Sequence, residues 1–308
     1  MESDLNSLLA RACDSVRTEI GKGKVADYIP ALAHVDPGRF GAAVVTVEGD
    51  CALYGDAAEP FSVQSISKLF TLTLALEKVQ QDLWERVGVE ASGNAFNSIL
   101  QLEREAGIPR NPFINAGALV VSDVLLGDSS PAVVIAELLT LLRTLSGDTS
   151  VHIDQQVAAS EKETGFRNAS LANFLKSFDN LKNDVDEVLE VYFNQCALAM
   201  TCEQLARSAL FLANGGVDPA SGHRVVNGRR ARRICSIMLT CGHYDASGEF
   251  AFRVGLPGKS GVGGGIVAVV PGRAAIAVWS PGLNKAGNSL VGTAALEAFV
   301  HTSGWNMF

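Results

Sequence analysis

Hydrophobic residues follow two different spacings along this chain, and the change between them divides it into regions. From Leu5 to Ile20, apolar side chains recur three and four positions apart, the spacing of a helix with one buried face. The residues 288–302 close the chain with another helical pattern. Both segments are therefore predicted to be helices that pack on a neighbouring layer.

Short apolar runs near both ends of the chain predict strands. We expect strands over residues 40–47, 51–55, 250–254, 265–270 and 274–279. The first two are separated by Glu48-Gly49-Asp50, and the last two are joined by Pro271-Gly272-Arg273. Both connections have the composition of tight turns, so each pair is predicted to be antiparallel.

The middle of the chain carries helical periodicity interrupted by polar loops. One predicted helix begins near Ser65 and reaches Val79. The others are predicted over residues 84–87, 95–105, 116–126, 131–145, 154–163, 168–178, 184–195, 202–213 and 231–241.

Strands at both ends of the sequence, with a helical insert between them, predict an α+β protein. We expect an antiparallel sheet flanked by helices and, beside it, an all-helical lobe. Residues 1–308 would form one unit, with an α/β lobe of about 1–68 and 246–308 and a helical lobe of about 69–245. The seam between two such lobes is a natural place for a pocket.

Composition narrows the possible functions. The chain has 308 residues, 47% of them hydrophobic, and a net charge of -8, which disfavours general nucleic-acid binding. No apolar run approaches the roughly 20 residues that span a bilayer, and the acidic start lacks a secretory signal. We therefore expect a cytoplasmic protein with neither a nucleic acid nor a membrane as partner.

Cysteine and histidine are spaced unlike metal ligands. The six cysteines show no C-x-x-C pair, and the five histidines are scattered singly. The thiols are expected to be buried and reduced. We predict no metal and no cofactor.

Ser65 and Lys68 form the first candidate for chemistry. Three residues apart, they share one face of a helix, one turn from its start. A neutral lysine can take the proton of a serine hydroxyl, and both burial and the helix N-terminus disfavour the charged lysine. Free N–H groups at the same helix start could stabilise an oxyanion. Ser-x-x-Lys alone is also compatible with a surface lysine on an amphipathic helix.

Two later triplets complete a constellation. Tyr192-Phe193-Asn194 and Lys259-Ser260-Gly261 follow in the order of the S-D-N and K-T-G motifs that accompany S-x-x-K in penicillin-binding proteins and class A β-lactamases. The Tyr192 hydroxyl could carry a proton to the leaving group, more readily if nearby lysines lower its pKa. Three triplets in order are far more specific than any one of them.

The glycines at 261–265 do not form a phosphate-binding loop, because the spacing G-x-x-x-x-G-K-[ST] is absent. They are expected instead to let a strand edge approach a substrate closely.

Four stretches resemble the serine-dependent glutaminase family of bacteria, and the resemblance extends from about residue 20 to 300. They are Gly23-Lys24-Val25-Ala26-Asp27-Tyr28-Ile29-Pro30, Gln64-Ser65-Ile66-Ser67-Lys68, Gly107-Ile108-Pro109-Arg110-Asn111-Pro112-Phe113-Ile114-Asn115-Ala116-Gly117-Ala118 and Gly258-Lys259-Ser260-Gly261-Val262-Gly263-Gly264-Gly265.

The resemblance implies a serine β-lactamase-like fold, hydrolysis of L-glutamine to L-glutamate and ammonia, no metal or cofactor, and a homo-oligomer, a dimer or tetramer. It implies that Ser65 is the nucleophile, beside Lys68. The positions that it implies for glutamine contacts are Tyr28, Asn115, Glu161, Asn168, Tyr192 and Tyr244, together with the backbone of Val262, which would join that of Ser65 at the oxyanion.

These residues suit the substrate chemically. Glu161 would take the ammonium group of glutamine, while Asn115, Asn168 and Tyr244 would hold its carboxylate. Lys259 would supply positive field. Glu161 and its neighbour Glu163 are both candidates for the ammonium partner.

Three questions stay open at the level of sequence. Lys68 could take the serine proton directly or through Tyr192. The same fold could hydrolyse β-lactams or peptides, although a cytoplasmic enzyme would not meet those substrates. The pocket could also serve a non-catalytic glutamine sensor, which the presence of both Lys68 and Tyr192 disfavours.

Overall fold

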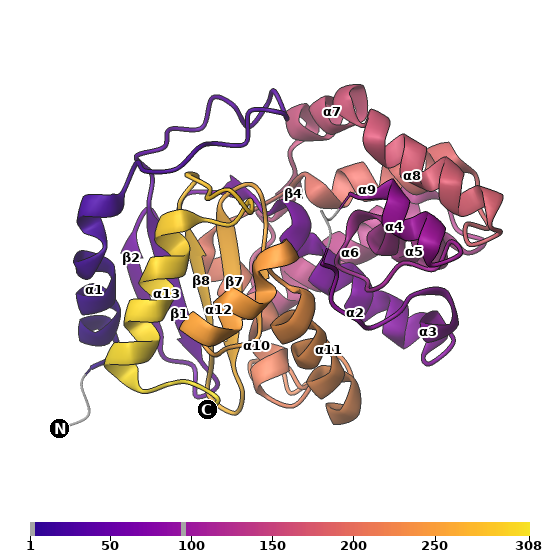
Figure 1. Cartoon of the computed structure of the whole chain (residues 1–308). Coiled ribbons are helices and arrows are strands. Elements are labelled where there is room, and N and C mark those ends of the chain that lie inside the picture. Colours follow the sequence, from indigo (N-terminus) through magenta and orange to yellow (C-terminus); the bar gives the residue numbers. More distant parts are fainter. Residues whose placement is uncertain (1–3, 94–96) are drawn as a thin grey trace.

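A five-stranded antiparallel sheet forms one half of the computed structural model, which describes residues 4–93 and 97–308 (Figure 1). Its strand order is β2-β1-β8-β7-β6. The strands are β1 (Gly41–Thr46), β2 (Cys51–Gly55), β6 (Gly258–Ser260), β7 (Gly265–Val270) and β8 (Ala274–Trp279). The strands from the two ends of the chain meet at the pairing of β1 with β8, where Val44 lies opposite Ile276. The predicted antiparallel sheet is confirmed, and β6 is an addition to it.

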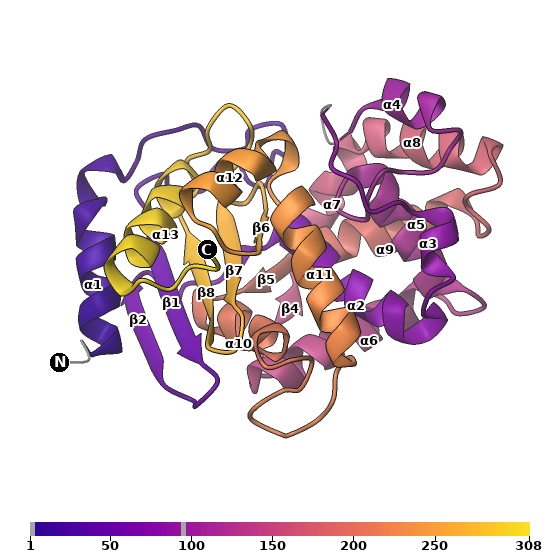
Figure 2. The same ribbon diagram turned by 60° about the horizontal axis from the view of Figure 1, so that its bottom comes forward.

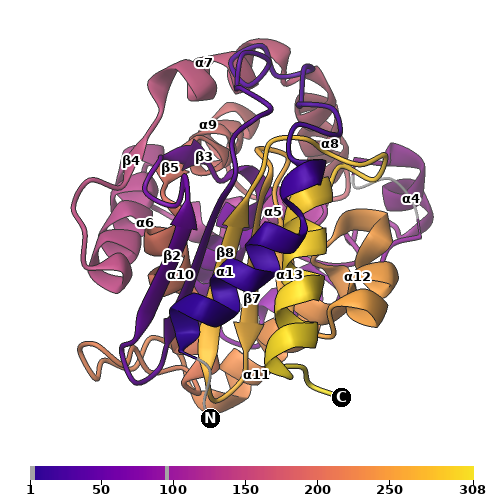
Figure 3. The ribbon, with the colours of Figure 1, turned by 90° about the vertical axis from the view of Figure 1, so that its left-hand side faces the viewer.

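Both faces of this sheet are covered. Ala42, Val44 and Ile276 belong to one hydrophobic cluster, whereas the alternate residues Ala43 and Val45 belong to another, as the period of two in a strand requires. The first cluster packs under α1 (Leu5–Ser15) and α13 (Leu290–Ser303), which lie side by side across the sheet (Figure 3). On the other face, α10 (Cys202–Ala213) packs against β1, β7 and β8.

The helical lobe surrounds α5, in which every residue is buried. A short helix, α4, lies toward its outer edge, and α11 lies between this lobe and the sheet (Figure 2). The helices of the lobe and of the connections to the sheet are α2 (Ser67–Val79), α3 (Leu83–Arg86), α4 (Ile99–Arg104), α5 (Asn115–Leu126), α6 (Pro131–Ser146), α7 (Gln155–Thr164), α8 (Phe166–Ser177), α9 (Val185–Cys196), α11 (Gly228–Cys241) and α12 (Ser247–Arg253). Single turns of 3₁₀-helix cover Arg17–Glu19, Gln64–Ile66 and Tyr244–Ala246.

A second, much smaller sheet connects the two halves. It has the order β3-β5-β4, formed by β3 (Phe61–Ser62), β5 (Leu198–Met200) and β4 (His152–Ile153). In this sheet Phe61 pairs with Met200 and Ser62 with Ala199. The segment that leads to Ser65 is thus fixed to the chain that follows α9.

The prediction of a strand over 250–254 is wrong, because this segment is the end of helix α12. A strand would place Phe250 and Phe252 on the same face. In the helix Phe250 is 3% exposed and Phe252 is 91% exposed, while Val254, four residues after Phe250, is buried with it. Five apolar residues are too few to distinguish the two periods.

The other predicted helices are present, and most begin or end within a few residues of the expected positions. Of the helix predicted over 95–105, Ala95 and Phe96 lie outside the described residues, and the helix observed there is α4. The division into lobes at about 68/69 and 245/246 stays a prediction, and α10, from within the expected helical lobe, packs on the sheet. In the described part of the chain no single helix has the length and apolarity to cross a bilayer, although α5 and α6, bent by 101°, meet those criteria as a pair.

Candidate active site

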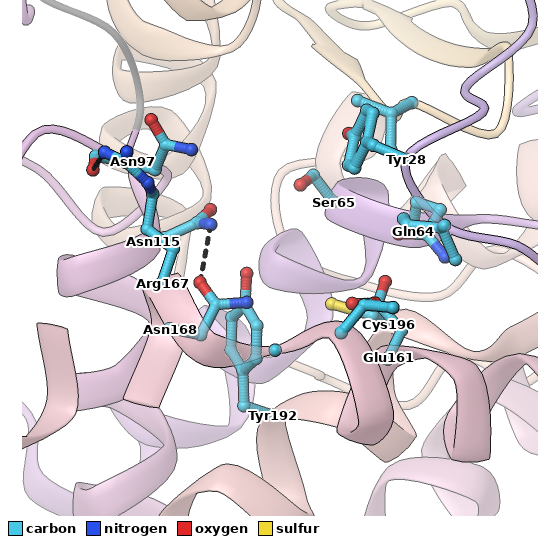
Figure 4. A pocket seen from close by; sticks show the side chains of 14 residues that line it. Tyr28, Gln64, Ser65, Asn97, Asn115, Glu161, Arg167, Asn168, Tyr192 and Cys196 are labelled. Carbon is cyan, nitrogen blue, oxygen red and sulfur yellow. Dashed lines mark hydrogen bonds between the residues drawn. The ribbon is translucent and has the colours of Figure 1, made fainter. Parts of the chain in front are cut away.

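A cavity of about 240 Å³ lies where the loop after α1, the Ser65 turn and helices α7 to α9 meet (Figure 4). Seven of the residues predicted for the site line it, namely Tyr28, Ser65, Asn115, Glu161, Asn168, Tyr192 and Val262. Lys68, Lys259 and Tyr244 are buried near it without forming its wall. The predicted residues therefore come together in space from widely separated parts of the sequence.

Ser65 lies in the 3₁₀ turn that precedes α2, and it is 7% exposed. Gln64, directly before it, has φ of +51°, a left-handed conformation that costs a residue with a side chain on the order of 1 kcal/mol. The pairing of β3 with β5 and the hydrogen bond from Val63 N to Leu198 O (2.9 Å) hold this turn from the N-terminal side. A strained turn thus presents the serine to the cavity.

Lys68 is buried one turn into α2, with 1% of its surface exposed. Its Nζ donates to Asn115 Oδ1 at 2.7 Å and to the carbonyl oxygen of Phe113 at 3.3 Å. Burial lowers the pKa of Lys68 from 10.5 to about 8, against the opposing influence of Cys196 and Glu161. A substantial neutral fraction at physiological pH is what a general base in this position needs.

Tyr192 is 3% exposed and comes from α9, with its ring centroid 5.7 Å from Lys68 Nζ. Burial raises the pKa of Tyr192 well above 10, and the neighbouring Cys196 and Glu161 raise it further. The condition that nearby lysines lower this pKa is not met, because burial dominates and also favours the neutral form of both lysines. Tyr192 is therefore a neutral phenol that can donate a proton.

Lys259 lies in β6 and is fully buried. Its Nζ donates to the carbonyl oxygens of Ser260 (2.5 Å) and Gly242 (3.2 Å), and it lies 5.0 Å from the centroid of the Tyr244 ring. Burial, reinforced by Lys68, lowers the pKa of Lys259 well below 10.5. The positive field that we expected from Lys259 is correspondingly reduced.

Tyr244 has φ of +56° and is buried. Burial raises its pKa, whereas hydrogen bonds with the Ser65 side chain and the Val262 backbone act in the opposite direction. The phenol therefore lies beside the Ser65 side chain and the Val262 backbone. Its predicted contact with the substrate carboxylate stays a prediction.

Three further polar side chains line the cavity, Asn115 and Asn168 on one side and Glu161 beside Gln64 on the other (Figure 4). Asn115 Nδ2 donates to Asn168 Oδ1 at 2.9 Å, which joins the start of α5 to α8 (Figure 4). Glu161 is 6% exposed, and burial raises its pKa from 4.5 to about 7, opposed by a hydrogen bond with Gln64 and by Lys68. Glu163, the alternative considered from the sequence, is exposed and does not line the cavity.

The glycine loop, residues 261–265, packs closely against protein backbone. A Cβ at Gly261 would overlap the carbonyl oxygen of Val63, and one at Gly263 would overlap that of Ser62. Only glycine permits this contact at those two positions. The glycines therefore allow close contact with the segment before Ser65, and the expected close approach to a substrate stays a prediction.

Several lining residues were not predicted, among them Gln64, Asn97, Arg167 and Cys196. Three of these had a signal in their spacing. Gln64 and Arg167 directly precede predicted residues, and Cys196 follows Tyr192 by one helical turn. Within the described ranges, no group of three or more His, Cys, Asp or Glu side chains is arranged to hold a metal ion.

The fold and the site together define a class. An antiparallel sheet covered by helices, a helical lobe beside it, and a serine and lysine three residues apart at their junction are the features of a hydrolase with the serine β-lactamase-like fold.

Comparison with known proteins narrows this class to one family. The family model described as glutaminase matches residues 23–308. A glutaminase of Rhizobium leguminosarum bv. trifolii is 60% identical over 306 residues, which cover 99% of each chain. The solved structure of a probable glutaminase, YbaS, superposes with a TM-score of 0.92 at 37% identity, covering 99% of both chains. A probable glutaminase from Bacillus subtilis, complexed with 6-diazo-5-oxo-L-norleucine, gives 0.89 at 34% identity, covering 100% of this chain and 98% of that one.

The chain belongs to the glutaminase family, and it is a hydrolase that acts on an amide. The resemblance and the fold class predicted from the sequence are both confirmed.

Proposed function

We propose that this protein hydrolyses L-glutamine to L-glutamate and ammonia through an acyl-enzyme on Ser65. The observation that carries the proposal is the buried Lys68, whose lowered pKa of about 8 accompanies a serine on the cavity wall. An amine that is largely charged in water becomes a usable base here. The glutaminases among the relatives support amide hydrolysis of glutamine as the reaction.

The first half of the reaction forms the ester. Neutral Lys68 takes the hydroxyl proton of Ser65, directly or through Tyr192, as the serine oxygen attacks the side-chain amide carbon of glutamine. The backbone N–H groups of Ser65 and Val262 then stabilise the oxyanion, an effect worth roughly 3 to 4 kcal/mol per donor in comparable sites. Tyr192 donates a proton to the nitrogen as the C–N bond breaks and takes the proton held by Lys68 in return, so ammonia leaves and both groups are neutral again.

The second half releases the product. A water molecule loses a proton to the same base and attacks the ester carbon, and the Ser65 oxygen regains a proton as glutamate departs. The high pKa of Tyr192 keeps the phenol protonated before each step and favours its return to the neutral form afterwards.

The polar wall of the cavity matches the two charged groups of an amino acid. The Glu161 carboxylate would bind the ammonium group, and the linked amides of Asn115 and Asn168 would bind the carboxylate. Tyr28, from the loop after α1, would cover the bound substrate at the mouth.

Replacement of the serine tests the proposal. Ser65→Ala should abolish ammonia release from glutamine while the protein stays folded. Ser62→Ala is the matched control, because this hydroxyl is also near the site but is bonded to the carbonyl oxygen of Cys196 at 3.1 Å. Turnover by Ser65→Ala would eliminate the serine route.

Covalent labelling distinguishes the two nucleophiles of the cavity. A glutamine-like electrophile should add mass to the peptide that contains Ser65. Burial raises the pKa of the Cys196 thiol to about 12, so this group should stay unmodified at neutral pH. Labelling of Cys196 would point to a different mechanism.

We also propose that the chain is cytoplasmic, that it forms a homo-oligomer (a dimer or tetramer), and that it folds as two lobes at about the boundaries predicted above.

Two assays separate the alternative functions. A chromogenic β-lactam should not be hydrolysed, because the proposed substrate is glutamine. Binding of glutamine without steady-state ammonia would favour the sensor over the enzyme.

A further inference from the structure

Trp279, the last residue of β8, contacts two segments that adjoin the site, the glycine loop and β3, but it does not line the cavity. It is 4% exposed. Its Nε1 donates to the carbonyl oxygen of Gly263 at 3.1 Å, and its ring stacks on Phe61 with centroids 5.0 Å apart and planes within 6°. One side chain therefore touches the glycine loop and the strand that leads to Ser65.

The contact with Gly263 bears directly on Val262, because the two residues share a peptide bond. The loop is closed by Gly264 N to Gly261 O (3.0 Å) and by Gly261 N to Gly265 O (3.0 Å). Ser280 N, the residue after Trp279, donates to Gly264 O at 3.0 Å. The end of β8 thus holds the loop at two successive carbonyls.

The contact with Phe61 bears on Ser65. Phe61 begins β3, and the chain passes from it through Val63 into the 3₁₀ turn that carries the serine. The loop lies directly on this segment, since a Cβ at Gly263 would overlap the Ser62 carbonyl oxygen. The position of the loop relative to the serine therefore depends on contacts that meet at Trp279.

We propose that Trp279 is a positioning residue that sets the separation of the two oxyanion donors, the N–H groups of Ser65 and Val262. The stacking on Phe61 fixes the segment that carries Ser65, and the indole hydrogen bond to Gly263 fixes the loop that carries Val262. This inference rests on the proposed function, because it assigns Trp279 a role in stabilising the oxyanion of that reaction. Donors aimed at the oxyanion matter in the transition state far more than in the ground state.

Trp279→Phe separates the two contacts. Phenylalanine retains an aromatic ring against Phe61 but cannot donate to Gly263. We expect kcat for glutamine to fall about 10- to 100-fold, as a displacement near 1 Å produces in other sites. KM and the inhibition constant of glutamate should change less than about twofold, because the side chains proposed to bind the charged groups of the substrate (Glu161, Asn115 and Asn168) belong to α7, α5 and α8 and not to the loop or β3.

Trp305→Phe is the matched control, with the same chemical change in a tryptophan that packs on Phe299 and Arg273. It should retain the kcat of the unmodified enzyme. A role of Trp279 in packing alone would lower the melting temperature of Trp279→Phe and leave its kcat within twofold, which would overturn the inference.

A second probe removes the donor at nearly constant shape. Benzothienylalanine, incorporated at position 279 by nonsense suppression, carries sulfur in place of the indole N–H. The kcat should fall as in Trp279→Phe, and full activity would overturn the inference even if Trp279→Phe failed to fold. If the unmodified enzyme released no ammonia from glutamine, the proposed function would fail. If the unmodified enzyme and both Trp279 variants were fully active, this inference alone would fail.

Discussion

Two buried lysines, Lys68 and Lys259, accompany one serine, and burial lowers the pKa of both amines. Each Nζ is provided with carbonyl oxygens to which it donates, so neither polar group is left without a partner. A buried lysine in its charged form destabilises the folded protein, so two of them near one cavity point to a functional site. The chemistry of the site therefore begins with the removal of water from these amines.

The lowered pKa of Lys68 predicts the pH dependence of the reaction. Below a pH of about 8 the amine binds a proton and cannot accept that of Ser65, so kcat/KM should rise as the pH approaches that value. Glu161, with a pKa of about 7, would add a step in the same direction, because only its carboxylate binds an ammonium group. The measurement is kcat/KM from about pH 6 to about pH 10. A profile that is flat across this range would show that Lys68 is not the base.

The burial of Glu161 predicts which of the two glutamates binds substrate. Glu161→Gln should raise KM for glutamine by at least about tenfold, because a charged hydrogen bond contributes roughly 1.5 to 3 kcal/mol. Glu163→Gln, two residues away and exposed, is the matched control and should leave KM within about twofold. Initial rates across a range of glutamine concentrations measure both. An equal effect of the two substitutions would refute the assignment.

At the scale of elements, α7 and α8 place Glu161 and Asn168 on the cavity wall through their junction at Gly165. The side chain of Asp154 begins α7 by accepting from Gln156 N (2.9 Å) and Val157 N (3.1 Å). At the other end, a Cβ on Gly165 would overlap the ring of Phe193. The cap and the close contact together fix both helices against α9.

Gly165→Ala should therefore disturb both stability and binding. The added methyl group would meet the Phe193 ring and, at 2.7 Å, the Glu161 carbonyl oxygen, which should cost about 1 to 3 kcal/mol and raise KM. Gly248→Ala, in α12, meets no atom within 4 Å and should change the free energy of unfolding by less than about 1 kcal/mol. Urea titrations of both variants give the comparison. A Gly165→Ala protein as stable as Gly248→Ala would contradict it.

The sequence predicted the long elements well, because periodicity over ten or more residues determines a helix and a turn between apolar runs determines a hairpin. It did not predict β3, β4, β5 or β6, which have two or three residues each and are too short to show a period; β3, β4 and β5 exist only through pairing with distant segments. The error at 250–254 has the same origin, since burial of Phe250 but not Phe252 follows from packing.

The candidate site was predicted less evenly. Ser65, Lys68 and Tyr192 had motifs with chemical meaning, whereas Glu161 came only from resemblance, because sequence alone gives no reason to prefer it to Glu163. Burial separates these two glutamates. The raised pKa of Tyr192 could not be predicted either, since the extent of its burial is a property of the folded molecule.

At the scale of the whole molecule, the site belongs to both halves. The cavity takes Tyr28, Ser65 and Val262 from segments near the sheet, and Glu161 and Tyr192 from the helical side. The small sheet formed by β3, β4 and β5 holds these halves together beside the serine. A ligand in the cavity should therefore stabilise the chain as one unit.

Glutamate, the product of the proposed reaction, should bind the native protein and not the unfolded chain. At a concentration 100 times its Kd it should increase the free energy of unfolding by about 2.7 kcal/mol in one cooperative transition. Calorimetric melting with increasing glutamate measures this, and Glu161→Gln should respond less at the same concentrations. Stabilisation of only one of two separate transitions would show that the halves unfold independently.

The meeting of the glycine loop with the backbone before Ser65 also has a consequence during synthesis. The serine leaves the ribosome early, but Val262 and Trp279, which complete its surroundings, come from the last part of the chain. A nascent chain that has already synthesised helices α1 to α12 still lacks β8, the strand that closes the site. On these grounds, the growing polypeptide should remain without amidase activity until β8 has emerged and paired with β1.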